Sequence, residues 1–137
     1  MVAVTRFEDL IVWQKARQLA KEVHAACATG RVVHDYALTD QMRRASVSIV
    51  SNIAEGFERK NPSYFGQFLS YARGSCAELR AQLYLASDVG WLLESEFSRL
   101  SLLARQKSPA CLERSTSRSQ PLPNHLVDLN TQLLSPH

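Results

Sequence analysis

The sequence predicts an all-α protein, an up-down antiparallel four-helix bundle with an irregular C-terminal tail. Apolar residues recur at alternating spacings of three and four in four successive segments, as on the buried face of a helix. No segment alternates apolar and polar residues over the length of a strand. Short connections join the segments and favour antiparallel neighbours. The 137 residues, 45% of them hydrophobic, are expected to form one domain over residues 1–106 and a Ser/Pro-rich tail over residues 107–137.

The first helix is expected to begin at Thr5, because Thr5 and Glu8 have the spacing of a capping box. It should end near Ala28, where Thr29 and Gly30 follow. Its buried stripe consists of residues spaced three or four apart: Trp13, Ala16, Ala20, Val23 and Cys27.

The second helix is expected to start with Thr39 as its N-cap and to continue to about Gly56. Its stripe has the same spacing: Met42, Ala45, Ile49, Ile53 and Phe57. Further apolar residues, Val47, Val50 and Ala54, make this helix more apolar than one neighbour would require, which predicts several packing partners.

The third helix should begin after Asn61, because Pro62 suits the first helical position, and should end at Gly90. Its buried residues are expected to be Phe65, Phe68, Ala72, Cys76, Leu79, Leu83 and Ala86. A shorter fourth helix is predicted over residues 95–106, with Phe97, Leu100, Leu103 and Ala104 on one side. Pro109 prevents its continuation, and in the tail residues 125–134 alone could form another helical piece.

Small and polar residues line one side of both central helices, beside their apolar stripes. These residues are Ser48, Asn52, Glu55 and Gly56 in the second helix and Gly74, Ser75, Glu78 and Gln82 in the third. We interpret them as a close helix crossing, where small residues let the backbones approach and polar groups bond across the seam.

Catalytic and metal sites are the alternative for these polar residues. Glu55 and Glu78 could pair for acid/base chemistry or bind a metal, but none of the four histidines follows a Glu by three residues, as di-metal bundles require. His24 and Cys27 share a helix face without a second pair of ligands. The sequence contains no P-loop, and Cys76 lies on the apolar stripe. We therefore expect no enzyme, no metal and no cofactor.

Basic residues are the candidates for nucleic-acid binding. The net charge is only +3, and the candidates are Arg43, Arg44, Arg59, Lys60, Arg73 and Arg80. Asp40 precedes Arg43 and Arg44 by three and four residues, so a local ion-pair cluster on a solvated face is the alternative interpretation.

Location can also be predicted from the sequence. The three cysteines lack C-x-x-C spacing, which predicts reduced and mostly buried thiols. No apolar stretch approaches the length of a membrane span, and the N-terminus lacks the pattern of a signal peptide. A cytoplasmic protein without membrane contact is expected.

Three segments resemble the family of 23S ribosomal RNA intervening-sequence proteins. They are FEDLIVWQKARQLAKEV (7–23), QMRRASVSIVSNIAEGFER (41–59) and FLSYARGSCAELRAQL (68–83). The resemblance covers about residues 5–106 and implies a four-helix protomer that assembles into a homopentamer. A related protein is the nucleic-acid-binding accessory subunit of diversity-generating retroelements. The tail departs from the family pattern, as a shifted reading frame near Gln106 would produce.

The resemblance implies no catalytic residues. It assigns an architectural role to the seam residues, and it connects nucleic-acid binding with Arg43 and Arg44. The leading hypothesis is a non-enzymatic homopentamer that serves as an RNA- or DNA-associated accessory module. The alternative is a scaffold that binds another protein and no nucleic acid, which the low net charge favours.

Overall fold

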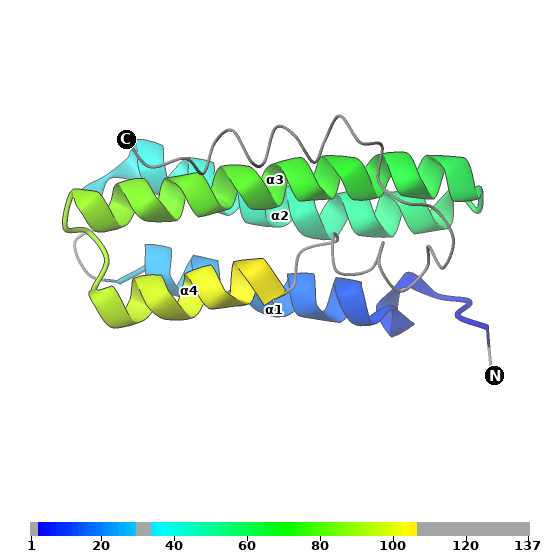
Figure 1. The fold of residues 1–137 in the computed structure, drawn as a ribbon, viewed down its shortest axis with the longest axis horizontal. Helices are drawn as coiled ribbons and strands as arrows, with labels where there is room; N and C mark the ends of the chain where they lie inside the picture. Colours follow the sequence, from blue (N-terminus) through cyan, green and yellow to red (C-terminus); the bar gives the residue numbers. More distant parts are fainter. Residues whose placement is uncertain (1–2, 30–33, 107–137) are drawn as a thin grey trace, which may run out of the picture.

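The computed structural model describes residues 3–29 and 34–106, and in this part of the chain the all-α prediction is confirmed. A short 3-10 helix, η1 (Phe7–Asp9), precedes four α-helices: α1 (Ile11–Cys27), α2 (Tyr36–Glu58), α3 (Pro62–Asp88) and α4 (Glu94–Gln106). Figure 1 shows an antiparallel bundle in which α2 and α3 form one layer and α1 and α4 the other. The expectations for Gly30, Cys111 and the tail from residue 107 onward lie outside the described residues.

The core lies between the two layers, and the longest helix contact joins α2 and α3. Leu19, Met42, Ile53, Leu79 and Leu100 are at most 1% exposed. The contact is extensive because α2 and α3 are the longest helices and each has an apolar stripe along most of its length. Val47 on α2 is nevertheless 48% exposed, and Val50 and Ala54 are half-buried. The described protomer therefore leaves part of the apolar surface of α2 uncovered.

The expected start of the first helix at Thr5 is wrong. The chain forms η1 instead, and Leu10 has an extended conformation (φ −70°, ψ 124°) that separates η1 from α1. This break lets Phe7 fold back onto Trp13, with ring centroids 5.0 Å apart, while the Glu8 carboxylate lies 3.5 Å from Arg6. Packing of the apolar side chains thus prevails over the capping-box pattern.

The expected N-cap of α2 is also wrong, because the helix begins one turn earlier. The Asp35 side chain accepts a hydrogen bond from the Leu38 backbone N–H at 2.9 Å, so Asp35 is the N-cap. Thr39 lies inside the helix, where its hydroxyl donates to the Asp35 carbonyl at 2.9 Å. The earlier start brings Leu38 into the core at 8% exposure.

The boundaries of α3 are those that the sequence predicts. The Asn61 side chain accepts a hydrogen bond from the Ser63 N–H at 2.9 Å, and Pro62 occupies the first helical position. Gly90 follows the helix with φ 76°, a left-handed conformation that suits glycine. The Trp91 N–H then donates to the Ala86 carbonyl at 2.9 Å, which reverses the chain toward α4.

Candidate nucleic-acid interface and the α2–α3 seam

The predicted polar seam between α2 and α3 forms around Ser48. The hydroxyl oxygens of Ser48 and Ser75 lie 2.8 Å apart across the two helices. The Asn52 side-chain amide donates to the Ser48 carbonyl at 2.8 Å and to its hydroxyl oxygen at 3.0 Å. All three side chains are partly buried, so these bonds satisfy groups that would otherwise be costly to enclose. The seam therefore stabilises one alignment of α2 against α3.

Gly56 makes the close approach that the sequence predicts. It is buried, and a Cβ atom placed on it would lie only 2.5 Å from Phe68 Cβ. Gly74 differs, since a Cβ there would meet nothing within 4 Å and the residue is exposed. The expectation that Gly74 lies in the crossing is wrong, because Ser75, one residue and 100° further around α3, occupies that side.

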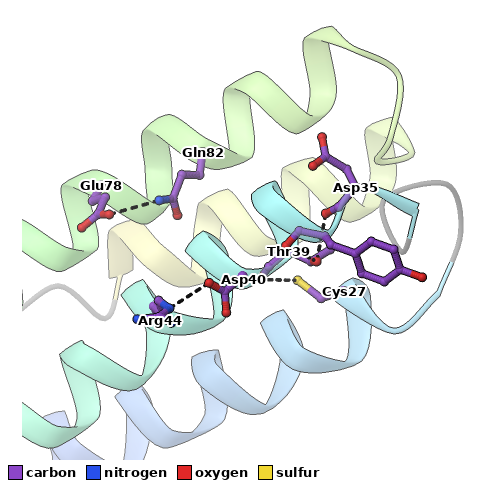
Figure 2. Close-up of polar contacts among 8 residues, drawn as sticks. Cys27, Asp35, Thr39, Asp40, Arg44, Glu78 and Gln82 are labelled. Atoms are coloured by element: carbon purple, nitrogen blue, oxygen red, sulfur yellow. Dashed lines mark hydrogen bonds and ion pairs between the residues drawn. The ribbon is translucent and has the colours of Figure 1, made fainter.

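Four of the predicted seam residues bond within their own helices and not across the seam: Asn52, which donates to Ser48, and Glu55, Glu78 and Gln82. Arg59 donates to the Glu55 carboxylate at 3.1 Å, and Gln82 donates to the Glu78 carboxylate at 3.2 Å (Figure 2). The two helices are antiparallel, and the Ser48–Ser75 contact shows which residues are level with each other. Glu55 lies seven residues from this contact in one direction and Glu78 three residues in the other. The two carboxylates are therefore ten residues apart along the bundle axis, roughly 15 Å. Carboxylates that act as a catalytic pair are separated by roughly 5–10 Å. The structure does not bring these two together.

The other candidate ligands, His24 and Cys27, differ in exposure, since His24 is exposed and Cys27 is buried. His24 Nδ1 lies 2.9 Å from the Ala20 carbonyl. Cys27 Sγ lies 4.0 Å from the Thr39 carbonyl oxygen, a contact that Figure 2 shows. Among the described residues, no three His, Cys, Asp or Glu side chains come close enough to hold a metal ion.

The two cysteines of the described helices are free thiols in the core, as predicted. Burial raises the pKa of Cys27, and the positive charge of Arg43 limits that rise. Burial raises the pKa of Cys76 to about 11. Neither thiol has the lowered pKa of a cysteine nucleophile.

The basic candidates of α2 lie at its two ends. Near the start, Arg44 donates to Asp40 at 2.8 Å, which is the predicted local ion pair (Figure 2). At the other end, Arg59 pairs with Glu55, and its guanidinium lies 5.1 Å from the Phe68 ring centroid. Lys60 is exposed and lies two residues beyond the end of α2, with φ 52°. Fifteen residues separate Arg44 from Arg59, roughly 22 Å along the axis, so the two ends do not form one compact site.

Arg73 and Arg80 lie on a different side of the bundle. They are seven residues apart on α3, and Tyr84 shares their side. Tyr84 marks the side that faces α4, because its ring packs on Phe97 and its hydroxyl accepts a hydrogen bond from Arg105 at 3.1 Å. These two arginines are therefore remote from Arg43 and Arg44.

Two exposed cations of α1 that the sequence analysis did not identify, Arg17 and Lys21, lie at a similar level along the bundle to Arg43 and Arg44. The contact of Cys27 with Thr39 shows which residues of the antiparallel helices α1 and α2 lie at the same height along the bundle axis. At that alignment the four cations fall within roughly 9 Å along the axes.

Arg17 and Arg43 lie toward the side where α1 and α2 meet, whereas Arg44 shares the side of α2 that carries Ser48, which faces α3. The Arg43 charge acts on Cys27 of α1, and the Arg17 guanidinium lies 5.7 Å from the ring centroid of Trp13, which packs on η1. We use the name α1–α2 basic face for the four cations that the two helices carry at this level: Arg17, Lys21, Arg43 and Arg44. In the sequence, the spacing of Arg17 and Lys21 by four residues indicates that these two cations share one side of α1.

Within the described ranges, none of the helices is both long and apolar enough to cross a membrane.

The family model of the 23S rRNA-intervening sequence protein matches residues 8–110 of this chain. No curated protein matches the chain.

The fold is similar to the crystal structure of a protein of unknown function from the S23 ribosomal protein family of Bacteroides thetaiotaomicron. The two share 14% sequence identity with a TM-score of 0.69, and the alignment covers 78% of this chain and 100% of that one.

Proposed function

Because this chain belongs to the 23S rRNA-intervening sequence protein family, we propose that it is a non-enzymatic, self-assembling helical protein that associates with RNA. The observation that carries the proposal is the α1–α2 basic face, where two helices contribute cations at one level of the bundle. The separation of Glu55 from Glu78 supports a role without catalysis.

The basic face suits contacts with phosphates. Arg17, Lys21 and Arg44 are exposed, and Arg43 is half-buried. Each phosphate contact releases counterions, so the binding constant falls as the salt concentration rises. In a plot of log binding constant against log salt concentration, each contact contributes a slope of about −0.9 with a duplex and about −0.7 with a single strand. Four contacts predict a slope near −3.6 for duplex RNA and near −2.8 for single-stranded RNA.

Fluorescence anisotropy with labelled duplex and single-stranded RNA, and with DNA of the same sequences, tests this association. The Arg43→Ala/Arg44→Ala variant should bind more weakly, with a salt slope shallower by about 1.4–1.8, because two phosphate contacts are lost. The matched control is Arg73→Ala/Arg80→Ala, which removes the same charge from another side. Absence of binding even near 50 mM salt, or equal weakening by both double variants, would contradict the proposal.

The substitutions should leave the fold intact. Asp40 and Arg44 form an exposed pair, with side chains 58% and 76% accessible, and such pairs contribute at most about 1 kcal/mol. Circular dichroism of each variant provides the control for folding.

Self-assembly into a homopentamer is the second part of the proposal. The uncovered apolar surface of α2 at Val47, Val50 and Ala54 supports it, because a neighbouring copy would bury these side chains. Sedimentation equilibrium of the wild type should give five protomer masses. A Val47→Asp variant should dissociate, whereas a wild-type protein that sediments as a monomer would refute self-assembly.

A protein-binding scaffold without nucleic-acid binding is the second candidate. It is favoured by the ion pairs of Arg44 with Asp40 and of Arg59 with Glu55, which neutralise part of the basic charge. Capture of one defined partner that persists after nuclease treatment, together with no RNA binding at low salt, would favour the scaffold.

A further inference from the structure

An apolar hollow of about 320 Å³ lies at the end of the α2–α3 pair opposite their connecting turn. Its lining residues are Asp35, Ala37, Leu38, Gln41, Leu85, Val89 and Trp91. Leu85 and Val89 are each 53% exposed although they stand one turn apart on α3, and Leu38 is buried. The hollow is thus an exposed apolar site with a buried floor.

The walls of this hollow are held by the ends of two helices. The Asp35 side chain caps α2, and Gly90 with the Trp91–Ala86 hydrogen bond fixes the turn after α3. Leu92, the next residue, is 6% exposed and anchors the same turn in the core. The site is therefore formed in the free protomer, which lowers the ordering cost of binding.

Size and charge indicate what fits there. A volume near 320 Å³ is at the small end for ligand pockets and suits one large apolar side chain better than a whole metabolite. Asp35 stands at the edge of the hollow, and Glu78 shares the side of α3 that carries Leu85, seven residues away. Seven residues correspond to two helical turns, roughly 10 Å. Arg44 stands one turn from Gln41, but its charge is balanced by the ion pair with Asp40. A complementary ligand thus combines an apolar group with positive charge.

We propose that this hollow binds a basic amphipathic helix of a partner protein. An apolar anchor side chain of that helix enters between Leu85 and Val89, as in other helix-in-groove complexes. Lys or Arg residues on either side of the anchor pair with Asp35 and with Glu78, so one of them stands about two turns from the anchor. The proposal does not rest on RNA association, because the anchor site is formed by Leu85 and Val89 of the α3 end, whereas the cations of the α1–α2 basic face belong to α1 and α2.

Trp91 offers a direct readout of binding. The chain contains two tryptophans, so a Trp13→Phe variant leaves Trp91 as the sole tryptophan. The probe is a synthetic helical peptide of about 15 residues of Ala, Gln and Lys with one central Phe anchor. We expect a saturable change in Trp91 emission, and none with a peptide in which Glu replaces every Lys.

Two sets of variants test the apolar and the charged contacts. Leu85→Asp/Val89→Asp should weaken peptide binding by about tenfold or more, as expected for the pocket of an anchor residue. The matched control Ile11→Asp/Leu102→Asp alters equally exposed apolar residues elsewhere, at 66% and 54%, and should bind as the wild type does.

Asp35→Asn, which keeps the capping function, combined with Glu78→Gln should weaken binding and reduce its salt dependence. An unchanged Trp91 emission with the Lys peptide, or equal loss in the control, would overturn the proposal. Dissociation of the wild-type assembly by Leu85→Asp/Val89→Asp in sedimentation would also overturn it, because a second copy would then be the occupant.

Discussion

Substitution of Gly56 by alanine tests the packing between α2 and α3. The added Cβ would lie 2.5 Å from Phe68 Cβ and 3.3 Å from both Phe65 Cδ2 and Phe68 Cγ. Ordinary contact begins near 3.4 Å, so the helices must separate by about 0.9 Å at this point. The nearest atom is next to the backbone and cannot rotate away. Overpacking of this kind costs about 1–3 kcal/mol, against a gain in helix propensity of about 1 kcal/mol.

The matched control is Gly74→Ala, where a Cβ meets nothing within 4 Å. Both substitutions gain the same helix propensity, so the difference between them isolates the clash. We expect Gly74→Ala to raise the free energy of unfolding by about 0.5–1 kcal/mol and Gly56→Ala to fall about 1–3 kcal/mol below it. Urea unfolding followed by circular dichroism measures both. Equal stabilisation by the two substitutions would refute the close approach of Gly56 to Phe68.

Three further perturbations follow from the structure. Ser75→Ala removes the hydrogen bond with Ser48 and should lower the free energy of unfolding in urea by about 1 kcal/mol. Asn61→Ala removes the cap that binds the Ser63 N–H and should cost about 1 kcal/mol, seen as a lower Tm, while Asn61→Asp should not. The folded-state pKa of Cys76, about 11 against 9.0, means that unfolded thiols ionise first as pH rises. The free energy of unfolding of the wild type should therefore be about 1.4 kcal/mol lower at pH 10 than at pH 8 because of this thiol. The Cys76→Ala variant should not show this loss.

Local patterns predict the helices well, but they do not decide between competing caps. Asn61 with Pro62 defines the start of α3 because both residues act on the same few backbone groups. Thr39 has an equally good capping side chain, yet Asp35 caps α2 because an earlier start buries Leu38. Thr5 fails as a cap because Phe7 packs on Trp13. Each error arises from tertiary burial, which a short window of sequence does not contain.

The α2–α3 seam was predictable only in part, because a short window of sequence contains no tertiary contacts. Helical periodicity places Ser48 and Ser75 beside the apolar stripes, and their contact confirms the prediction. Periodicity cannot show that Gly74 turns away, since neighbouring positions differ by 100°. The α1–α2 basic face was missed altogether, because the level of Arg17 relative to Arg43 is known only once the two helices are aligned.

The most direct test of the central claim is the salt dependence of RNA binding by an Arg17→Ala/Lys21→Ala variant. If α1 and α2 form one basic face, this variant should lose as much affinity as Arg43→Ala/Arg44→Ala, with a slope shallower by about 1.4–1.8 than that of the wild type. An unchanged slope in the α1 variant would contradict the α1–α2 basic face as the RNA-binding surface.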